Sequence, residues 1–162
     1  PETAYPLLVL RENIYTDPQK PIQVQPGVYE INDPKPEDPV LVTTNFSITY
    51  FSVANEVESA GLPAWLVVTE SEGMSVLTAW AAGKFAGDDV GMFVKKSGIA
   101  DKVKNQELII PGYAAAIAGD VEEELPGGTA SAALSGPSFA TEVARGLPTA
   151  VTVASATLAQ VA

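Results

Sequence analysis

Short apolar runs alternate with amphipathic segments over most of the chain. Five runs rich in Val, Leu, Ile and Ala predict strands: residues 40–43, 64–68, 107–110, 130–134 and 149–153. The spacing of apolar residues predicts helices between them: residues 46–59, 75–86, 88–96, 114–124 and 139–145. Continuous apolar runs are typical of parallel strands that are buried on both faces. The alternation therefore predicts an α/β fold, a Rossmann-like three-layer sandwich around a mainly parallel five-stranded sheet.

The beginning of the chain has a different pattern. Seven prolines after the first residue rule out long helices there. Two alternating segments, residues 22–24 and 28–31, flank a Pro-Gly pair, and this arrangement predicts a short β-hairpin. Residues 32–39 have the composition of a linker. We therefore expect an N-terminal extension over residues 1–39 and a Rossmann-like domain over residues 40–162.

Charge is distributed unevenly along the chain. Nine Lys and Arg against 20 Asp and Glu give a net charge of −11 at pH 7, and residues 129–162 hold only Glu142 and Arg145. This change predicts a boundary that splits the domain into residues 40–127 and 128–162. A polyanion repels phosphate backbones and anionic lipids, so we expect neither nucleic acid nor a membrane as partner. No apolar run reaches the ~20 residues of a membrane span and no signal peptide is visible, which predicts a cytoplasmic protein.

The residue types that are missing exclude several kinds of site. The sequence contains no Cys and no His. Thiolate or imidazole metal sites, iron–sulfur clusters and Ser-His-Asp or Cys-His catalysis are therefore excluded. Neither G-x-G-x-x-G nor G-x-x-x-x-G-K-[ST] occurs, which disfavours ordinary dinucleotide and nucleoside-triphosphate sites. We expect no metal site and no catalytic residue.

Candidate ligand-binding residues lie in four loops that follow predicted strands: residues 43–47, 69–75, 111–114 and 135–138. These loops are rich in hydroxyl groups and small residues, and open parallel sheets bind ligands beyond the carboxyl ends of their strands. The helix N-termini that follow would accept a phosphate or another polar group. The alternative is structural, with Ser47 and Ser75 as helix N-caps and the glycines serving turns. Trp65 and Trp80 are expected in the core.

Five segments within residues 7–127 form a specific pattern: NIYTDP at 13–18, PIQV at 21–24, TTNFS at 43–47, EGMSVLTAWAAGKF at 72–85 and IPGY at 110–113. They resemble the large subunit of the corrinoid iron–sulfur protein family, the gamma subunit of acetyl-CoA decarbonylase/synthase. That family carries a methyl group on cobalt between methyltetrahydrofolate and acetyl-CoA synthase. The resemblance implies the Rossmann-like corrinoid domain of such a subunit, without its iron–sulfur domain and most of its barrel.

The resemblance also implies how cobalamin, or another corrinoid, would bind. Without His, the cobalt would have no protein imidazole on its lower face, and the detached base would lie between the strands. The residues implied to contact the corrin ring or its tail are Thr44, Tyr50, Met74, Ser75, Val76, Leu77, Thr78, Gly112, Tyr113, Ala114 and Pro137. We expect the interfaces with the natural partner subunit and with the folate methyltransferase to be lost, and the chain not to be an enzyme.

The last part of the chain carries a second pattern: LSGPSFA at 134–140, EVARGLPTA at 142–150 and VAS at 153–155. It resembles NAD(P)-dependent glycerol-3-phosphate dehydrogenase, which implies substrate contacts at Gly136 and Ser138 and a cofactor contact at Ala140. The glycine-rich loop, the catalytic lysine and the substrate domain of that family are missing, so NAD(P) binding is disfavoured. Two families within one domain predict an engineered chimera. Three functions stay open: corrinoid binding without turnover, a folded scaffold without ligand, and an NAD(P)-binding fragment.

Overall fold

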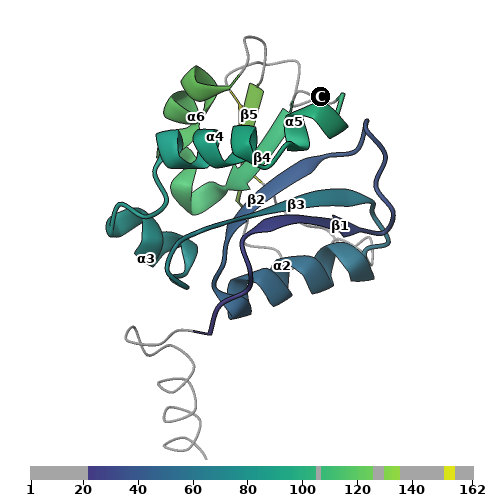
Figure 1. Cartoon of the computed structure of the whole chain (residues 1–162), viewed down its shortest axis with the longest axis horizontal. Coiled ribbons are helices and arrows are strands. Elements are labelled where there is room, and N and C mark those ends of the chain that lie inside the picture. Colours follow the sequence, from purple (N-terminus) through teal and green to yellow (C-terminus); the bar gives the residue numbers. More distant parts are fainter. Residues whose placement is uncertain (1–21, 105–106, 126–129, 136–151, 156–162) are drawn as a thin grey trace, which may run out of the picture.

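A single mixed β-sheet forms the middle layer of the protein (Figure 1). The computed structural model describes residues 22–104, 107–125, 130–135 and 152–155. The six strands of the described chain are β1 (Gly27–Ile31), β2 (Val40–Thr44), β3 (Ala64–Thr69), β4 (Glu107–Pro111), β5 (Ala130–Ser135) and β6 (Thr152–Ser155). Their order across the sheet is β1-β3-β2-β4-β5-β6. The predicted Rossmann-like α/β fold is confirmed.

The direction of the outer strands differs from the prediction. β3, β2, β4 and β5 run parallel, whereas β1 pairs antiparallel with β3 and β6 pairs antiparallel with β5. The parallel part therefore has four strands and not five. An apolar run predicts a strand but not its direction, because side chains alternate between the two faces in the same way in both orientations. The helix predicted over residues 139–145 lies outside the described residues.

Helices cover both faces of the sheet (Figure 1). On one face, α2 (Ser47–Ser59) contacts β1, β2 and β3. The other face carries α3 (Val76–Ala81), α4 (Gly87–Lys96), α5 (Ile99–Lys102), the 3₁₀ helix η1 (Gly112–Ile117) and α6 (Ala118–Glu124). On this face α3 contacts β2, α4 contacts β3 and α6 contacts β5. The result is the expected three-layer arrangement.

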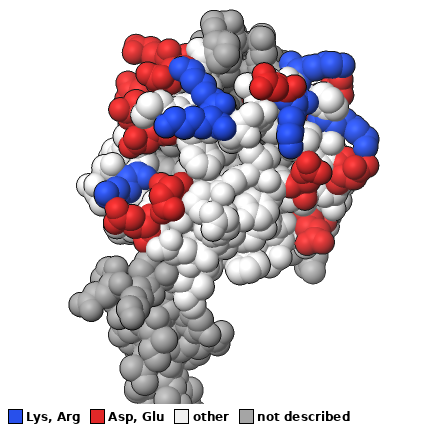
Figure 2. All heavy atoms as spheres, in the orientation of Figure 1, with Lys and Arg blue, Asp and Glu red and all other residues white. Residues whose placement is uncertain are grey.

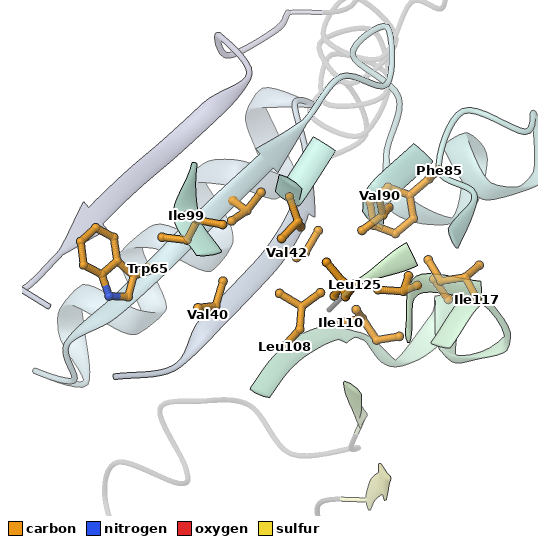
Figure 3. Packing of buried hydrophobic residues seen from close by; sticks show 14 of the residues in the cluster. Val40, Val42, Trp65, Phe85, Val90, Ile99, Leu108, Ile110, Ile117 and Leu125 are labelled. Atoms are coloured by element: carbon orange, nitrogen blue, oxygen red, sulfur yellow. The ribbon is translucent and has the colours of Figure 1, made fainter. Parts of the chain in front are cut away.

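The main apolar core lies between the sheet and the helices of this second face (Figure 3). Val42, Val67 and Ile110 of the strands meet Phe85 and Val90 of the helical layer. Alternation along β3 sends Leu66 and Val68, which are fully buried, to the α2 face. The strands are therefore buried on both sides, as continuous apolar runs predict.

The two tryptophans have different environments. Trp65 on β3 is buried, and its indole N–H donates a hydrogen bond to the Lys35 carbonyl oxygen at 3.0 Å. Trp80 is 42% exposed, so its predicted place in the core is wrong. The reason is that α3 packs through the buried Ala79, and the helical rotation of about 100° per residue turns the next side chain outward.

The predicted hairpin is not formed. The Val24 N–H donates to the Asn45 carbonyl and the Ser47 N–H to the Ile22 carbonyl, while β1 pairs with β3. Both predicted hairpin arms therefore pair with the following domain and not with one another. Apolar alternation around a Pro-Gly pair marks two extended segments, but longer-range partners decide what they pair with.

Two helices differ in length from their predictions. The helix predicted over residues 75–86 ends at Ala81, because Gly83 adopts a left-handed φ of 67° and the Lys84 N–H turns back to the Ala79 carbonyl. The helix predicted over residues 114–124 is divided into η1 and α6. The predicted boundary at 127–128 lies outside the described residues, and β5 beyond it continues the sheet beside β4.

Candidate functional site

The parallel strands β2, β3 and β4 end at one edge of the sheet, here called the carboxyl edge. The loop after β3, residues 70–75, leads into α3, and β4 leads directly into η1. Because α3 contacts η1, two groups of predicted ligand residues lie side by side. These are Met74, Ser75, Val76, Leu77 and Thr78 from the first segment and Gly112, Tyr113 and Ala114 from the second.

This part of the carboxyl edge exposes apolar side chains together with hydroxyl groups. Leu77 is 53% and Tyr113 77% exposed. The Ser75 hydroxyl occupies the N-cap position of α3, but it donates to Thr78 Oγ1 at 3.1 Å and accepts no backbone N–H of the helix. Capping by this side chain, predicted as one alternative, is therefore wrong. The surface offers apolar contact area with two polar hydroxyls beside it.

Ser47 also has a different role from the predicted N-cap. It is the first residue of α2, whose N-cap position is Phe46. Its hydroxyl donates to the Ile22 carbonyl at 2.8 Å and so fastens the incoming chain to the start of the helix.

The other predicted ligand residues are not brought to this surface. Thr44 is completely buried beneath it, and its Oγ1 has no hydrogen-bond partner among the described residues. Tyr50 lies on α2, on the opposite face of the sheet, with its ring 5.0 Å from that of Tyr29. Burial raises the pKa of the Tyr50 hydroxyl above its ordinary value. Pro137 lies outside the described residues.

The loop after β3 is held by an asparagine whose role the sequence pattern did not reveal. Asn45 follows β2 and is fully buried. Its Oδ1 accepts hydrogen bonds from the Ser71 N–H (3.1 Å), the Ser71 hydroxyl (2.7 Å) and the Gly73 N–H (2.9 Å). Its Nδ2 donates to Glu70 Oε1 at 3.1 Å and to Gln23 Oε1 at 3.3 Å. In the sequence, the only indication of this role is that Asn45 is the one amide residue in the loop at 43–47, which otherwise carries mainly hydroxyl side chains.

The loop itself contains a tight turn. The Met74 N–H donates to the Ser71 carbonyl at 3.0 Å, and the two residues between them have left-handed φ angles, 55° at Glu72 and 71° at Gly73. These angles correspond to a type I′ turn, in which a non-glycine residue is strained. Glu72 pairs with Lys84 at 2.8 Å, and this hydrogen bond raises the pKa of the Lys84 ammonium above 10.5. Asn45 therefore holds the turn on its buried side, and the ion pair between Glu72 and Lys84 holds it on its exposed side.

A half-open cleft of about 400 Å³ lies between this loop and α4. Its charged walls are formed by Glu70, Glu72 and Asp89 together with Lys84 and Lys96. Among the described residues, no group of three or more carboxylates lies close enough to hold a metal ion. One wall of the cleft, residues 69–72, belongs to a loop that the sequence predicted as a candidate ligand site, whereas the wall from α4 was not predicted.

Charged side chains cluster at the rim of the molecular face in Figure 2, and the centre of that face is uncharged.

Within the part of the chain that the structure describes, no helix has the length and apolar character to cross a membrane.

Comparison with known proteins finds relatives that are named as subunits of acetyl-CoA synthase or decarbonylase/synthase complexes and of the corrinoid/iron-sulfur protein. The CO dehydrogenase/acetyl-CoA synthase delta subunit family matches residues 1–139. The acetyl-CoA decarbonylase/synthase complex subunit gamma of Archaeoglobus fulgidus is 44% identical over 119 residues, 74% of this chain and 25% of that protein. The corrinoid/iron-sulfur protein large subunit of Moorella thermoacetica is 45% identical over 122 residues, 75% of this chain and 27% of that protein. The chain thus spans about a quarter of the length of these curated relatives.

These relatives correct two predictions. The prediction that the chain is not an enzyme is wrong, because relatives of the chain are named as subunits of the acetyl-CoA decarbonylase/synthase complex. The prediction that natural partner interfaces are lost is also wrong, because the same relatives are named as parts of a multi-subunit complex.

The chimera and the resemblance to glycerol-3-phosphate dehydrogenase stay predictions. The family match continues to residue 139, beyond the predicted boundary at 127–128. The resemblance to the corrinoid iron–sulfur protein large subunit is confirmed by the match and by the relatives. Because the match covers most of its 162 residues, the chain belongs to the CO dehydrogenase/acetyl-CoA synthase delta subunit family.

Proposed function

We propose that this chain binds a corrinoid, in the base-off form, at the carboxyl edge of its sheet. The observation that carries the proposal is the exposed apolar surface formed there by Leu77 and Tyr113, next to the hydroxyls of Ser75 and Thr78. Binding sites for small ligands combine mostly apolar contacts with a few polar groups that set the orientation of the ligand, and both kinds of group are present here. The name of the Moorella thermoacetica relative, corrinoid/iron-sulfur protein large subunit, supports the same ligand.

The residues present fit a corrinoid that has no protein ligand to its metal. The sequence has no His and no Cys, so neither imidazole nor thiolate can reach a cobalt from this chain. The buried Oγ1 of Thr44, which has no hydrogen-bond partner among the described residues, lies beneath the edge as a polar atom that a polar group of the ligand could satisfy. Of the predicted residues after β4, Tyr113 is exposed, whereas Ala114 is buried in the apolar core.

A bound corrinoid would supply a cobalt atom that carries the methyl group. This chain's own part would be to orient the ring through Leu77 and Tyr113 and to keep its lower side free of a strong ligand. We infer from the relatives' names that the domain does this within a multi-subunit complex.

The chimeric origin is a separate part of the proposal. The family match ends at residue 139 and the dehydrogenase-like pattern begins at residue 134, so a junction within residues 134–139 fits better than one at 127–128. The described strands β5 and β6 still complete the sheet on either side of that position.

Mixing the 162-residue chain with hydroxocobalamin or cob(II)alamin under reducing, anaerobic conditions tests the function. Co-elution of colour and protein from gel filtration, with a base-off spectrum, is the expected result. Separation of the colour from a protein shown by circular dichroism to be folded would refute corrinoid binding and leave a scaffold. A saturable change in NADPH fluorescence would favour the dehydrogenase fragment instead.

A matched pair of variants tests the site. Leu77→Arg places an unpaired charge under the ring and should weaken corrinoid binding about tenfold or more. Leu62→Arg is the control, because Leu62 is similarly exposed (62%) but lies before β3, at the opposite end of the sheet. Equal affinities of the two variants would show that the pocket lies elsewhere.

A further inference from the structure

Asn45 is the most highly bonded buried side chain among those described near the carboxyl edge. Its one amide group joins three parts of the chain: the segment before β1 through Gln23, the end of β2, and the loop after β3. These partners lie 22 to 28 residues away along the sequence. Hydrogen bonds of this kind fix the relative positions of segments that the helices and strands themselves do not connect.

The chemistry of the contact requires an asparagine. The Oδ1 atom meets three donors, and the Nδ2 group meets two acceptors, of which Glu70 Oε1 is a carboxylate. Leu at this position would remove all five hydrogen bonds. The Ser71 hydroxyl would keep the Met74 carbonyl and Glu70 Oε1 would keep the Glu72 N–H, but the Ser71 and Gly73 N–H groups would lose their acceptor, and buried unpaired groups are costly. Asp would keep the acceptor but would set a second carboxylate oxygen against Glu70. Only a side chain with both an acceptor and a donor satisfies the site.

The set of hydrogen bonds made by Asn45, here called the clamp, reaches the segment that leads to the surface proposed to hold the corrinoid. The Ser71 hydroxyl donates to Asn45 at 2.7 Å and lies 3.2 Å from the Met74 carbonyl oxygen. Residues 74 and 75 follow directly, and α3 has only six residues, so the loop determines where this short helix starts. The left-handed φ of Glu72 shows that the turn needs support from outside its own residues.

We propose that Asn45 is a positioning residue that holds the loop after β3, and with it residues 74–78, in the arrangement that receives the corrinoid. Its action is indirect, since Asn45 is fully buried and reaches the edge only through Ser71 and Gly73. This inference rests on the proposed function for the ligand, but the clamp itself is a property of the loop.

Three variants of the full chain test the role: Asn45→Asp, Glu70→Gln and the double variant. In Asn45→Asp, two carboxylate oxygens face each other where Nδ2 and Oε1 are now 3.1 Å apart, and they must share a proton or separate. Hydroxocobalamin affinity should fall about tenfold near pH 8 and recover toward about pH 5, where the pair can share a proton. In the double variant, the amide introduced at position 70 can donate to the carboxylate introduced at position 45. Its affinity should stay within about threefold of the wild type at every pH.

Each affinity is compared with the wild type at the same pH, which cancels titration of the ligand itself. Asn32→Asp is the matched control, because the Asn32 amide donates to the Val57, Glu58 and Leu62 carbonyls at the opposite end of the sheet. It should lower the midpoint of thermal unfolding without altering corrinoid affinity. A double variant no better than Asn45→Asp, or a loss that does not change with pH, would overturn the positioning role.

A second readout separates this inference from the proposed function. Amide hydrogen exchange of Ser71 and Gly73, measured by NMR without ligand, should speed up in Asn45→Asp near pH 8 and return to wild-type rates in the double variant. If the wild type binds no corrinoid but exchange follows this order, the clamp stands and the ligand assignment fails. If exchange at both amides is the same in all variants, the clamp is refuted whatever the ligand result.

Discussion

Two glycines of α4 lie in close contact with α6 and allow a direct test of the packing of the helical layer. A Cβ atom added at Gly87 would lie 2.5 Å from the Asp120 Cβ and 2.7 Å from the Ile117 carbonyl oxygen. At Gly91, one helical turn later, it would lie 2.5 Å from the Glu124 Cβ. Such atoms cannot rotate away, so Ala at either position must push the two helices apart.

Gly119 provides the matched control. It lies in α6, and a Cβ added there would meet nothing within 4 Å. Replacing an exposed helical Gly by Ala raises the free energy of unfolding by about 0.5–1 kcal/mol, because it restricts the unfolded chain. The same gain applies to Gly87→Ala, but overpacking costs about 1–3 kcal/mol, and the contact with a backbone oxygen points to the upper part of that range. We therefore expect Gly119→Ala to raise the free energy of unfolding by about 0.5–1 kcal/mol. We expect Gly87→Ala to lower it by about 1–2 kcal/mol.

Urea unfolding followed by far-ultraviolet circular dichroism measures both variants on the same scale. For a chain of this length the midpoint of thermal unfolding should move by about 2–4 °C per kcal/mol, upward for Gly119→Ala and downward for Gly87→Ala. Gly91→Ala should follow Gly87→Ala. If Gly87→Ala is as stable as Gly119→Ala, α4 and α6 do not approach as closely as the structure shows, and the reasoning fails.

Three further changes have expected outcomes. Thr44→Val removes a buried hydroxyl that has no partner among the described residues and should raise the free energy of unfolding in urea by about 1 kcal/mol; a decrease would reveal a partner. Trp65→Phe removes the hydrogen bond to the Lys35 carbonyl and should cost about 1–2 kcal/mol, whereas Trp80→Phe at the surface should change stability by less than about 0.5 kcal/mol. The hydrogen bond from Lys104 lowers the pKa of Glu37 below 4.5, so Lys104→Met should raise that pKa in an NMR titration. Because the folded-state pKa is the lower one, the pair contributes stability above pH 4.5 that is lost as the pH falls through the folded-state pKa; an unchanged pKa would contradict the contact.

The fold could be predicted because its signals are local. The strands β2, β3 and β4 contain continuous apolar runs, Val40–Val42, Ala64–Val68 and Leu108–Ile110, and such runs are typical of strands buried on both faces. The start of α2 was predicted to within one residue, because apolar spacing and the preceding strand define it together.

The candidate site could be predicted only in part. The rule that ligands bind beyond the carboxyl ends of parallel strands selected the loops at 69–75 and 111–114, and the resemblance extended the first to residue 78; the contact between α3 and η1 brings the two segments together. The resemblance alone selected Tyr50, which the structure places on the α2 face beside Tyr29. A residue four positions into a helix turns away from the edge by the helical period, and loop position alone does not include that rotation.

The sequence by itself determined which segments are strands and helices, the absence of His and Cys ligands, and the family, because each of these depends on residues that are neighbours in the chain. Only the tertiary structure decided that β1 pairs with β3, that β6 runs antiparallel, that Trp80 is exposed and that one amide of Asn45 joins three segments. The two strand pairings and the Asn45 contacts depend on groups that lie about 17 residues or more apart in the sequence, and the exposure of Trp80 depends on which side of α3 packs on the sheet. Hydrophobic periodicity specifies a buried face but not the partner that buries it, and that choice is made by packing of the whole chain.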